Sequence, residues 1–386
     1  MNVVLRTHPQ AGYNIYRHIT KDKEVNDCAS RDAHAYHSNM PPTEKLGTGW
    51  RVIDLCCGLG GISLAARSLG CEIAAGVDIS KSALETFKKH FPEASSILGS
   101  ISRAETVTAL NATINASSDQ RTLVVSGPPC QGFSVAGARV QRDPRNRILP
   151  AVGRAIAQIQ PTAALIENVA AILSDRHKRS VSRFLKIVSE AGYKHTILRM
   201  NAADYGVPQV RHRVFFLITR KSPSSKRIQY YISSLTRPKV SVREALSGLA
   251  SPPVYSKGNE IHDSGLQNHI AMRHSLRVRE KISAIKPGSG PMSYRRLHPD
   301  RPARTLISGN RAPPAHFEEP RSITVREAAR LQGFPDNFEV LGCFSKQMQL
   351  VTNAVPPPLA RAALITLFMT METTHGRTAT LSDKAS

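Results

Sequence analysis

The chain has 386 residues, and its 52 Lys and Arg against 29 Asp and Glu give a net charge of +23. An apolar fraction of 41% with 21% charged residues is typical of a globular protein and excludes a disordered or fibrous chain. No run of about 18 apolar residues predicts a membrane span, and residues 1–18 lack the apolar core of a signal peptide, so we expect a cytoplasmic protein. A surface this basic favours nucleic acid as a partner, the alternative being a basic protein without one.

The first 48 residues are polar and irregular, and we interpret residues 1–48 as an N-terminal extension outside the core. From Trp50 onward, short apolar runs alternate with stretches of helical spacing. The predicted strands are 51–57, 72–78, 122–127, 163–169, 195–200 and 214–220, and the predicted helices between them are 62–70, 82–91, 149–160 and 180–192. This alternation predicts an α/β fold with a doubly wound, mostly parallel sheet that is covered on both faces.

The alternation of strands and helices stops after Arg220. Residues 221–300 are rich in Pro, Gly and Ser and carry 14 Lys and Arg against 5 Asp and Glu, which makes this region more basic than the chain as a whole. Beyond it, 322–334 predicts a capped helix and 358–371 an apolar helix that packs back on the sheet. We therefore predict a cofactor-binding and catalytic domain at 49–220, a smaller irregular domain at 221–300, its remainder and a returning helix at 301–373, and a tail at 374–386.

Six cysteines are present, and none forms the CxxC pair of a zinc knuckle, so we expect no metal site. One of them stands in an unusual setting. Cys130 lies in the segment 126–134, SGPPCQGFS, directly after an apolar strand. Two prolines and two glycines fix the backbone there, and the arginines that follow favour the nucleophilic thiolate. Cys130 is thus a candidate nucleophile, whereas most lone cysteines are inert core residues.

A glycine-rich turn follows the first predicted strand of the α/β region. The chain reads DLCCGLGG over residues 54–61, and Asp78 closes the next strand, where an acid commonly holds a ribose hydroxyl. The spacing G-x-G-G differs from that of an ordinary NAD site. A nucleoside cofactor is therefore favoured over a purely structural turn.

Two further motifs end or enter strands of the same sheet. Glu167 closes one strand, so that its carboxylate can face the same edge as Cys130. Arg211 and Arg213 alternate at the entry to another strand, which places both on one face. Taken singly, each motif has a simpler interpretation. Glu167 could be a surface acid in a salt bridge, and the two arginines could be a solvated charge pair.

Taken together and in this order, these motifs resemble the DNA (cytosine-5)-methyltransferase family. The resemblance runs from about Val52 to Ala363 and includes SGPPCQGFS, ENV, QxRxR, TVREAARLQGFPD and NAVPPPLA. It implies the α/β fold of S-adenosylmethionine-dependent methyltransferases with a smaller target-recognition domain. It also implies transfer of a methyl group to C5 of a flipped-out cytosine in a specific duplex DNA sequence.

The resemblance implies a role for individual residues. The cofactor S-adenosyl-L-methionine, which leaves as S-adenosyl-L-homocysteine, would contact Gly58, Leu59, Gly60, Gly61, Asp78, Ile79, Ser100, Ile101, Pro128, Asn353 and Ala354. The catalytic residues would be Cys130, Glu167, Gln209, Arg211 and Arg213. Contacts with DNA would come from Ser134, Arg139, Arg145, Arg295, Arg296 and Thr305.

The implied reaction needs both a thiolate and an acid. Cys130 would add to C6 of the cytosine while Glu167 bonds N3 and the exocyclic amine and Arg213 contacts O2. The addition makes C5 nucleophilic, and loss of the C5 proton then expels the cysteine. Glu167 therefore needs surroundings that raise its pKa, and Cys130 surroundings that lower its own pKa. The target atom is inaccessible in a stacked duplex, so the base must flip out.

The sequence departs from the family pattern at three positions. Cys56 stands where an aromatic residue is usual, Ser100 replaces an aspartate, and Thr352 replaces a glycine. These changes put the strength of cofactor binding in doubt, although none removes a catalytic group.

Two other functions stay open. One is methylation of cytosine C5 in RNA, and the other is DNA binding without catalysis on the same scaffold. Among enzymes on this scaffold, a compact chain with a short recognition region resembles the modification partner of a bacterial restriction system. We then expect a monomer, with a cognate restriction endonuclease that acts on the same DNA site without being a stable subunit.

Overall fold

The structure is a computed structural model that describes residues 4–5, 43–114, 120–129, 147–254, 265–291, 294–307 and 313–372. Four residues with predicted roles, Cys130, Ser134, Arg139 and Arg145, lie outside the described residues. Most of the predicted extension 1–48 and the whole tail 374–386 lie outside them as well.

The centre of the molecule is an eight-stranded sheet with the order β1-β7-β9-β6-β5-β2-β3-β4. Its strands are β1 (Val4–Leu5), β2 (Trp50–Leu55), β3 (Glu72–Asp78), β4 (Ser95–Leu98), β5 (Arg121–Ser126), β6 (Ala163–Val169), β7 (Lys194–Asn201) and β9 (His212–Thr219). The five strands from β4 to β6 pair in parallel, whereas β9 runs antiparallel to both β6 and β7. The predicted mostly parallel, doubly wound sheet is confirmed.

Helices cover both faces of the sheet because successive strand residues point to opposite sides. In β2, Val52 joins the cluster beneath α2, α3, α7 and α12, and Ile53 joins the cluster beneath α4, α5 and α6. The helices of the first face are α2 (Gly61–Arg67), α3 (Lys81–His90), α7 (Ser225–Ser234) and α12 (Pro357–Glu372). Those of the second are α4 (Ala104–Ile114), α5 (Ile148–Ile159) and α6 (Lys178–Glu190). Short 3-10 turns complete this part at Thr43–Lys45, Ala170–Leu173, Asp175–His177 and Ala202–Tyr205.

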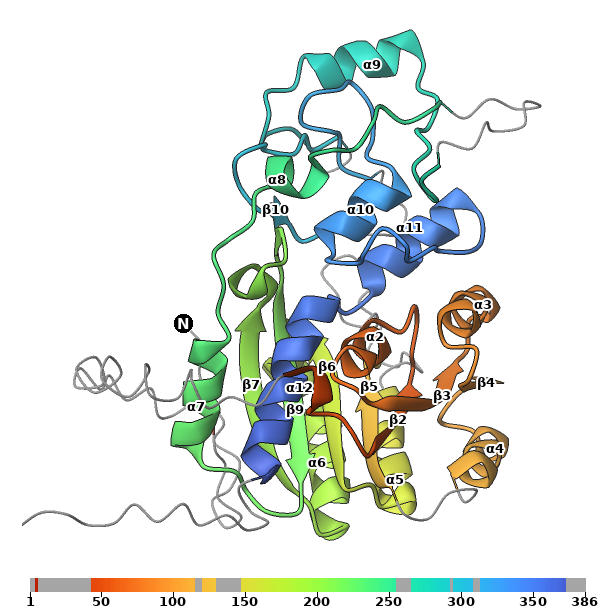
Figure 1. The fold of residues 1–386 in the computed structure, drawn as a ribbon, viewed down its shortest axis with the longest axis vertical. Coiled ribbons are helices and arrows are strands. Elements are labelled where there is room, and N and C mark those ends of the chain that lie inside the picture. Colours follow the sequence, from red (N-terminus) through yellow and green to blue (C-terminus); the bar gives the residue numbers. More distant parts are fainter. Residues whose placement is uncertain are drawn as a thin grey trace, which may run out of the picture.

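A second, smaller unit lies beyond one end of the sheet, at the top of Figure 1. It contains α8 (Val242–Leu246), α9 (Leu276–Ser283), α10 (Val325–Leu331) and α11 (Phe344–Asn353). Residues of α8, α10 and α11 share an apolar cluster, which also includes Leu59 and Ala83 of the larger unit. β10 (Ala303–Arg304) of this unit pairs in parallel with β8 (Gln209–Val210), which precedes β9. The segment carrying Gln209 and Arg211 therefore joins the two units.

Helix α7 packs with the sheet rather than with the smaller unit. Its Ile228 and Ile232 are buried in the cluster that contains Val52 and Phe215, and α12 lies beside it (Figure 1). A domain boundary at residue 221 would separate this helix from the surface it packs on. We therefore propose that the larger domain extends through α7.

One stretch of the described chain, Phe344–Met371, has the length and the apolar composition that a membrane-spanning helix would need. Residues 354–356 divide this stretch into α11 and α12. Of its most apolar 18 residues, 78% are buried inside the protein. Burial against the sheet and the smaller unit accounts for its apolar character.

The smaller unit contains a fully buried arginine. The Arg326 guanidinium donates to the carbonyl oxygens of Gln267 at 3.0 Å, Pro335 at 3.0 Å and Phe338 at 2.8 Å. Its side chain is 0% exposed, and burial lowers its pKa. One side chain therefore ties α10 to two separate loops.

We expect Arg326→Met to lower the free energy of unfolding by about 3 kcal/mol, because three backbone carbonyls, one of them buried, lose a charged donor. Arg277→Met, at an exposed position on α9, is the matched control and should change stability by less than about 0.5 kcal/mol. Urea unfolding monitored by circular dichroism measures both variants. Equal unfolding midpoints for the two would contradict the structural role of Arg326.

Candidate active site

The turn between β2 and α2 brings backbone close to other parts of the protein at two glycines. A Cβ on Gly61 would lie 2.2 Å from the carbonyl oxygen of Val355, and one on Gly60 would lie 2.6 Å from the Phe91 ring. Gly58, by contrast, has a φ of +53° and nothing within 4 Å of its Cβ position. Of the four predicted cofactor residues in this turn, Gly60, Gly61 and the buried Leu59 serve packing, while Gly58 borders open space.

Asp78 stabilises this turn from the end of β3. Its carboxylate accepts hydrogen bonds from the backbone N–H of Gly58 at 2.9 Å and of Ser80 at 2.8 Å. The next residue, Ile79, is 73% exposed, and the exposed Leu98 ends the neighbouring strand β4. The acid and the apolar side chains thus lie at one edge of the sheet, the edge where α/β folds bind ligands.

Asp54 is a buried acid of this turn to which the sequence analysis gave no role. It is 1% exposed, and one carboxylate oxygen, Oδ2, accepts from the Ser63 hydroxyl at 2.6 Å. The other, Oδ1, is buried without a hydrogen-bond partner among the described residues. Burial raises the pKa of Asp54 to about 7. An acidic residue near the end of a mostly apolar strand is the sequence signal that could have identified Asp54 as a candidate site residue.

The three departures from the family pattern have local structural consequences. Cys56 adopts a left-handed φ of 62°, and burial raises the pKa of its thiol to about 12. Ser100 hydrogen-bonds to the Ser102 hydroxyl at 2.8 Å, and Ile101 beside it is buried. Thr352 is buried, and its hydroxyl donates to the Met348 carbonyl within α11.

An ion pair lies at the carboxyl end of β6. Nε of Arg213 is 2.7 Å from Oε1 of Glu167, and both side chains are 9% exposed. Burial raises the pKa of Glu167, and the charges of Arg213 and Arg211 oppose that rise. The neighbouring Asn168 donates to the Pro128 carbonyl at 3.1 Å, which fixes the segment that leads to Cys130.

Arg211 is fully buried and faces the segment between α11 and α12. Its Nη2 donates to the carbonyls of Thr352 at 2.9 Å and Ala354 at 3.3 Å. Burial lowers its pKa well below the usual value, with the charge of Arg213 as a second cause. The structure thus brings three predicted residues together: Arg211, Arg213 and Ala354. Asn353, the remaining predicted residue of this segment, is exposed.

Gln209 links this arrangement to the smaller unit. Its Nε2 donates to the Leu331 carbonyl at 3.1 Å and to Oε1 of Gln332 at 2.6 Å, and its Oε1 accepts from the Leu306 N–H at 3.0 Å. Gln332 is 0% exposed and was not singled out from the sequence. A polar residue directly after the helix 325–331, next to the buried Leu331, was the available signal.

The residues of the smaller unit that are predicted to contact DNA differ in how far their side chains are already used in hydrogen bonds within the protein. The Arg296 guanidinium donates to four backbone carbonyls, those of His316, Ser283, Ile285 and Glu318. That guanidinium is committed to the fold, which makes it a poor DNA contact. Arg295 is partly exposed, and its Nε has no partner among the described residues. Thr305 is exposed, and its hydroxyl donates to the Val210 carbonyl at 2.7 Å.

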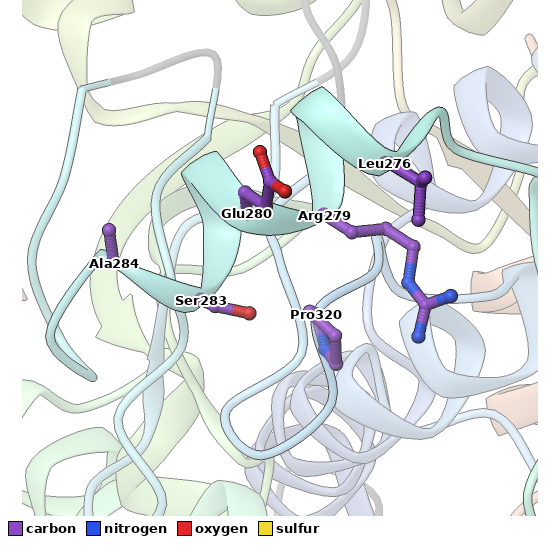
Figure 2. Close-up of a pocket in the computed structure, with 6 residues that line it drawn as sticks. All are labelled: Leu276, Arg279, Glu280, Ser283, Ala284 and Pro320. Carbon is purple, nitrogen blue, oxygen red and sulfur yellow. The ribbon is translucent and has the colours of Figure 1, made fainter.

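A surface hollow of about 630 Å³ lies elsewhere, beside α9 (Figure 2). Its lining residues are Leu276, Arg279, Glu280, Ser283, Ala284 and Pro320. None of the residues predicted to bind cofactor or to act in catalysis borders it. Within the described ranges, no group of three or more His, Cys, Asp and Glu could hold a metal ion.

Comparison with known proteins places this site in a family. The model of the C-5 cytosine-specific DNA methylases matches residues 50–368. The chain is 33% identical to the type II methyltransferase M1.HphI of Haemophilus parahaemolyticus, over 80% of this chain and 84% of that protein. It is 30% identical to M.DdeI of Desulfomicrobium norvegicum, over 81% and 86%.

Solved structures agree with the observed architecture. An E. coli prophage-encoded protein described as a DNA modification methyltransferase superposes with a TM-score of 0.68 at 26% identity, over 84% of this chain and 99% of that one. The S. pombe Dnmt2 methyltransferase, at 17% identity and a TM-score of 0.59, supports the fold alone. By sequence and by fold, this chain belongs to the C-5 cytosine-specific DNA methylase family.

Proposed function

We propose that this DNA cytosine methyltransferase transfers a methyl group from S-adenosyl-L-methionine to C5 of a flipped-out cytosine in duplex DNA, through a covalent bond between Cys130 and C6. The observation that carries the proposal is the buried pair of Glu167 and Arg213. It lies at the sheet edge that also bears the Gly58 turn and the segment leading to Cys130. Those are the positions at which base-binding, cofactor-binding and nucleophilic groups must meet.

The residues around the glycine turn fit the cofactor. Open space at Gly58, the exposed Ile79 and the unpartnered Oδ1 of Asp54 offer a backbone surface, an apolar contact and a buried acceptor. Asp78 would hold ribose hydroxyls with the lone pairs not used by the turn, and Asn353 and Ala354 would border the amino-acid end. When bound, this group supplies an electrophilic methyl on a sulfonium.

Glu167 would act on the base in its protonated form. Burial raises the pKa of its carboxyl, the direction that favours the form able to give a proton to N3 of cytosine, although Arg213 and Arg211 oppose the shift. Arg213 holds one carboxyl oxygen in place, and a donor at this position can also reach O2 of the base. These contacts withdraw electrons from the ring and prepare C6 for attack by the Cys130 thiolate.

DNA would lie between the sheet edge and the smaller unit, with that unit as the target-recognition domain. The net charge of +23 favours a polyanionic partner. Arg147 is exposed at the start of α5, next to the segment that carries Arg139 and Arg145. Arg295 and Thr305 remain proposed contacts on the recognition side, whereas Arg296 is withdrawn.

The relatives named above are type II methyltransferases, which supports a role in a restriction-modification system. We propose that the protein acts in the cytoplasm as a monomer and shares its recognition sequence with a cognate endonuclease. Bisulfite sequencing of DNA from cells that express the protein would identify that sequence.

We expect Cys130→Ala to abolish methylation, because no other group supplies the nucleophile, and to leave duplex DNA binding within about threefold of wild type. Transfer of a labelled methyl group to duplex DNA and to bulk tRNA measures the activity, and a gel-shift titration measures binding. Labelling of tRNA alone by the wild-type protein would favour the RNA alternative. DNA binding without any labelling would favour the non-catalytic one.

A fluorine at C5 of the target cytosine tests the covalent step. Release of Cys130 after methyl transfer requires loss of the C5 proton, which fluorine replaces. With S-adenosyl-L-methionine present, a 5-fluorocytosine duplex should therefore leave wild-type protein bound to DNA in denaturing gels. Cys130→Ala is the matched control and should show no such band. A band of equal strength from that variant would contradict the proposed bond.

We expect Arg213→Met to destabilise the protein by about 3 kcal/mol at pH 8 and by less at pH 5, because it leaves a buried carboxylate unpaired. Loss of the Arg213 charge raises the pKa of Glu167 further, and a carboxyl with a raised pKa costs stability as pH rises above its unfolded value. Urea unfolding at both pH values measures the difference. The double variant Arg213→Met/Glu167→Gln should lose this pH dependence, and its persistence there would assign it to another group.

A further inference from the structure

Two fully buried glutamines lie in contact where the larger and smaller units join. Gln209 precedes β9, Gln332 follows α10, and both are 0% exposed. Nε2 of Gln209 donates to Oε1 of Gln332 at 2.6 Å. This bond fixes the orientation of the Gln332 amide and leaves its Nε2 as a donor on the opposite side.

That donor reaches the segment between α11 and α12. Nε2 of Gln332 donates to the Ala354 carbonyl at 2.6 Å. The same oxygen accepts from Nη2 of Arg211 at 3.3 Å. One carbonyl oxygen, in the segment proposed to border the cofactor, is therefore held from two directions.

The other end of this network reaches the base-binding pair. Gln209 and Arg211 are the fourth and second residues before Arg213, whose Nε pairs with Glu167. The carbonyl oxygen Oε1 of Gln209 also accepts from Nη1 of Arg211 at 3.4 Å. A shift of Ala354 must therefore be accommodated either by Gln332 or by the strand segment that positions Arg213, because buried polar groups keep their partners.

We propose that Gln332 is a positioning residue that couples the cofactor side of the active site to its base-binding side. The inference rests on the proposed function, since it takes the segment at Ala354 as the cofactor border. Gln332 contacts neither reactant. It transmits the position of Ala354 to Gln209, and through it to Arg213 and Glu167, so that occupation of one side favours binding at the other.

The amide is the group that this role requires. It accepts from Gln209 and donates to Ala354 at the same time, which a methionine of similar length cannot do. A carboxylate in its place accepts from Gln209 but repels the Ala354 carbonyl, whereas a neutral carboxylic acid can both accept and donate. Gln332→Glu should therefore recover the function as pH falls, and Gln332→Met should not.

The experiment measures thermodynamic coupling without turnover. Calorimetry gives the affinity for S-adenosyl-L-homocysteine with and without a duplex that carries the sequence identified by bisulfite sequencing, and the ratio of the two affinities is the coupling factor. For wild type we expect a factor of at least about 5, within the usual range for coupled sites. For Gln332→Met we expect a factor near 1.

Gln347→Met is the matched control. Gln347 also donates from Nε2 to a backbone carbonyl, that of Val340 at 3.0 Å, in the smaller unit but away from Ala354. This control should keep the wild-type coupling factor even if its melting temperature falls as far as that of Gln332→Met. Gln332→Glu should show weak coupling at pH 8 and regain coupling as the pH falls, with the neighbouring Arg211 charge moving the recovery to lower pH.

The outcomes separate this inference from the proposed function. A wild-type protein that binds no S-adenosyl-L-homocysteine overturns both. A wild-type protein that binds it, with a coupling factor near 1 or with a factor that Gln332→Met leaves within twofold, overturns the role of Gln332 alone. Equal loss of coupling in Gln347→Met would assign the effect to general destabilisation and would also overturn that role.

Discussion

The arrangement of the site depends on the burial of a carboxylate against a guanidinium. Glu167 and Arg213 are withdrawn from water at the carboxyl end of β6, and the antiparallel pairing of β6 with β9 places Arg213 opposite Val169, two residues along the strand from Glu167. Desolvation disfavours the charged form of Glu167 in this buried position. The neighbouring arginines offset only part of this desolvation cost. The balance leaves Glu167 with a raised pKa, the property that acid assistance to cytosine requires. In the proposed mechanism, the reversed direction of β9 therefore contributes to the chemistry by bringing Arg213 to Glu167.

The glycine turn shows how packing and ligand binding divide a single motif. Gly61 allows the Val355 carbonyl to approach, and Gly60 allows the Phe87 and Phe91 rings to approach, so these residues attach the turn to α3 and to the start of α12. Gly58 alone faces open space, with its N–H held by Asp78. Most of the glycine-rich turn, which the sequence analysis assigned to cofactor binding, therefore serves packing. Only the backbone around Gly58 is left open to a ligand. The buried Asp54 next to this backbone adds a carboxylate oxygen, Oδ1, to the proposed cofactor site.

Polar contacts organise the region where the two units join, together with an apolar cluster that includes Leu59 and Ala83 of the larger unit and Phe334 and Phe338 of the smaller one. Arg211 and Gln332 converge on the segment between α11 and α12, and Gln209 hydrogen-bonds to Gln332, although these residues come from two distant parts of the chain. Directional hydrogen bonds of this kind fix the positions of the groups that they join. A methyltransferase must bring together a cofactor, a base and a nucleophile, so a rigid link between their binding elements suits the reaction.

The sequence by itself determined the class of the protein and the pattern of its sheet. The apolar runs of β2, β3, β5, β6, β7 and β9 were recognisable because buried strands must be apolar, and Cys130, Glu167, Arg211 and Arg213 stood at strand ends within family motifs. The strand β4 and the helices α4, α7, α8, α9 and α11 were missed. β4 is four residues long and mostly exposed, and α8 has only five residues, so both are too short for a clear pattern. Only the tertiary structure decided that Arg213 meets Glu167, that Arg296 is committed to carbonyls, and that Gln332 reaches Ala354. Such pairings depend on which side chains a fold buries together, and distance along a chain carries no information about that.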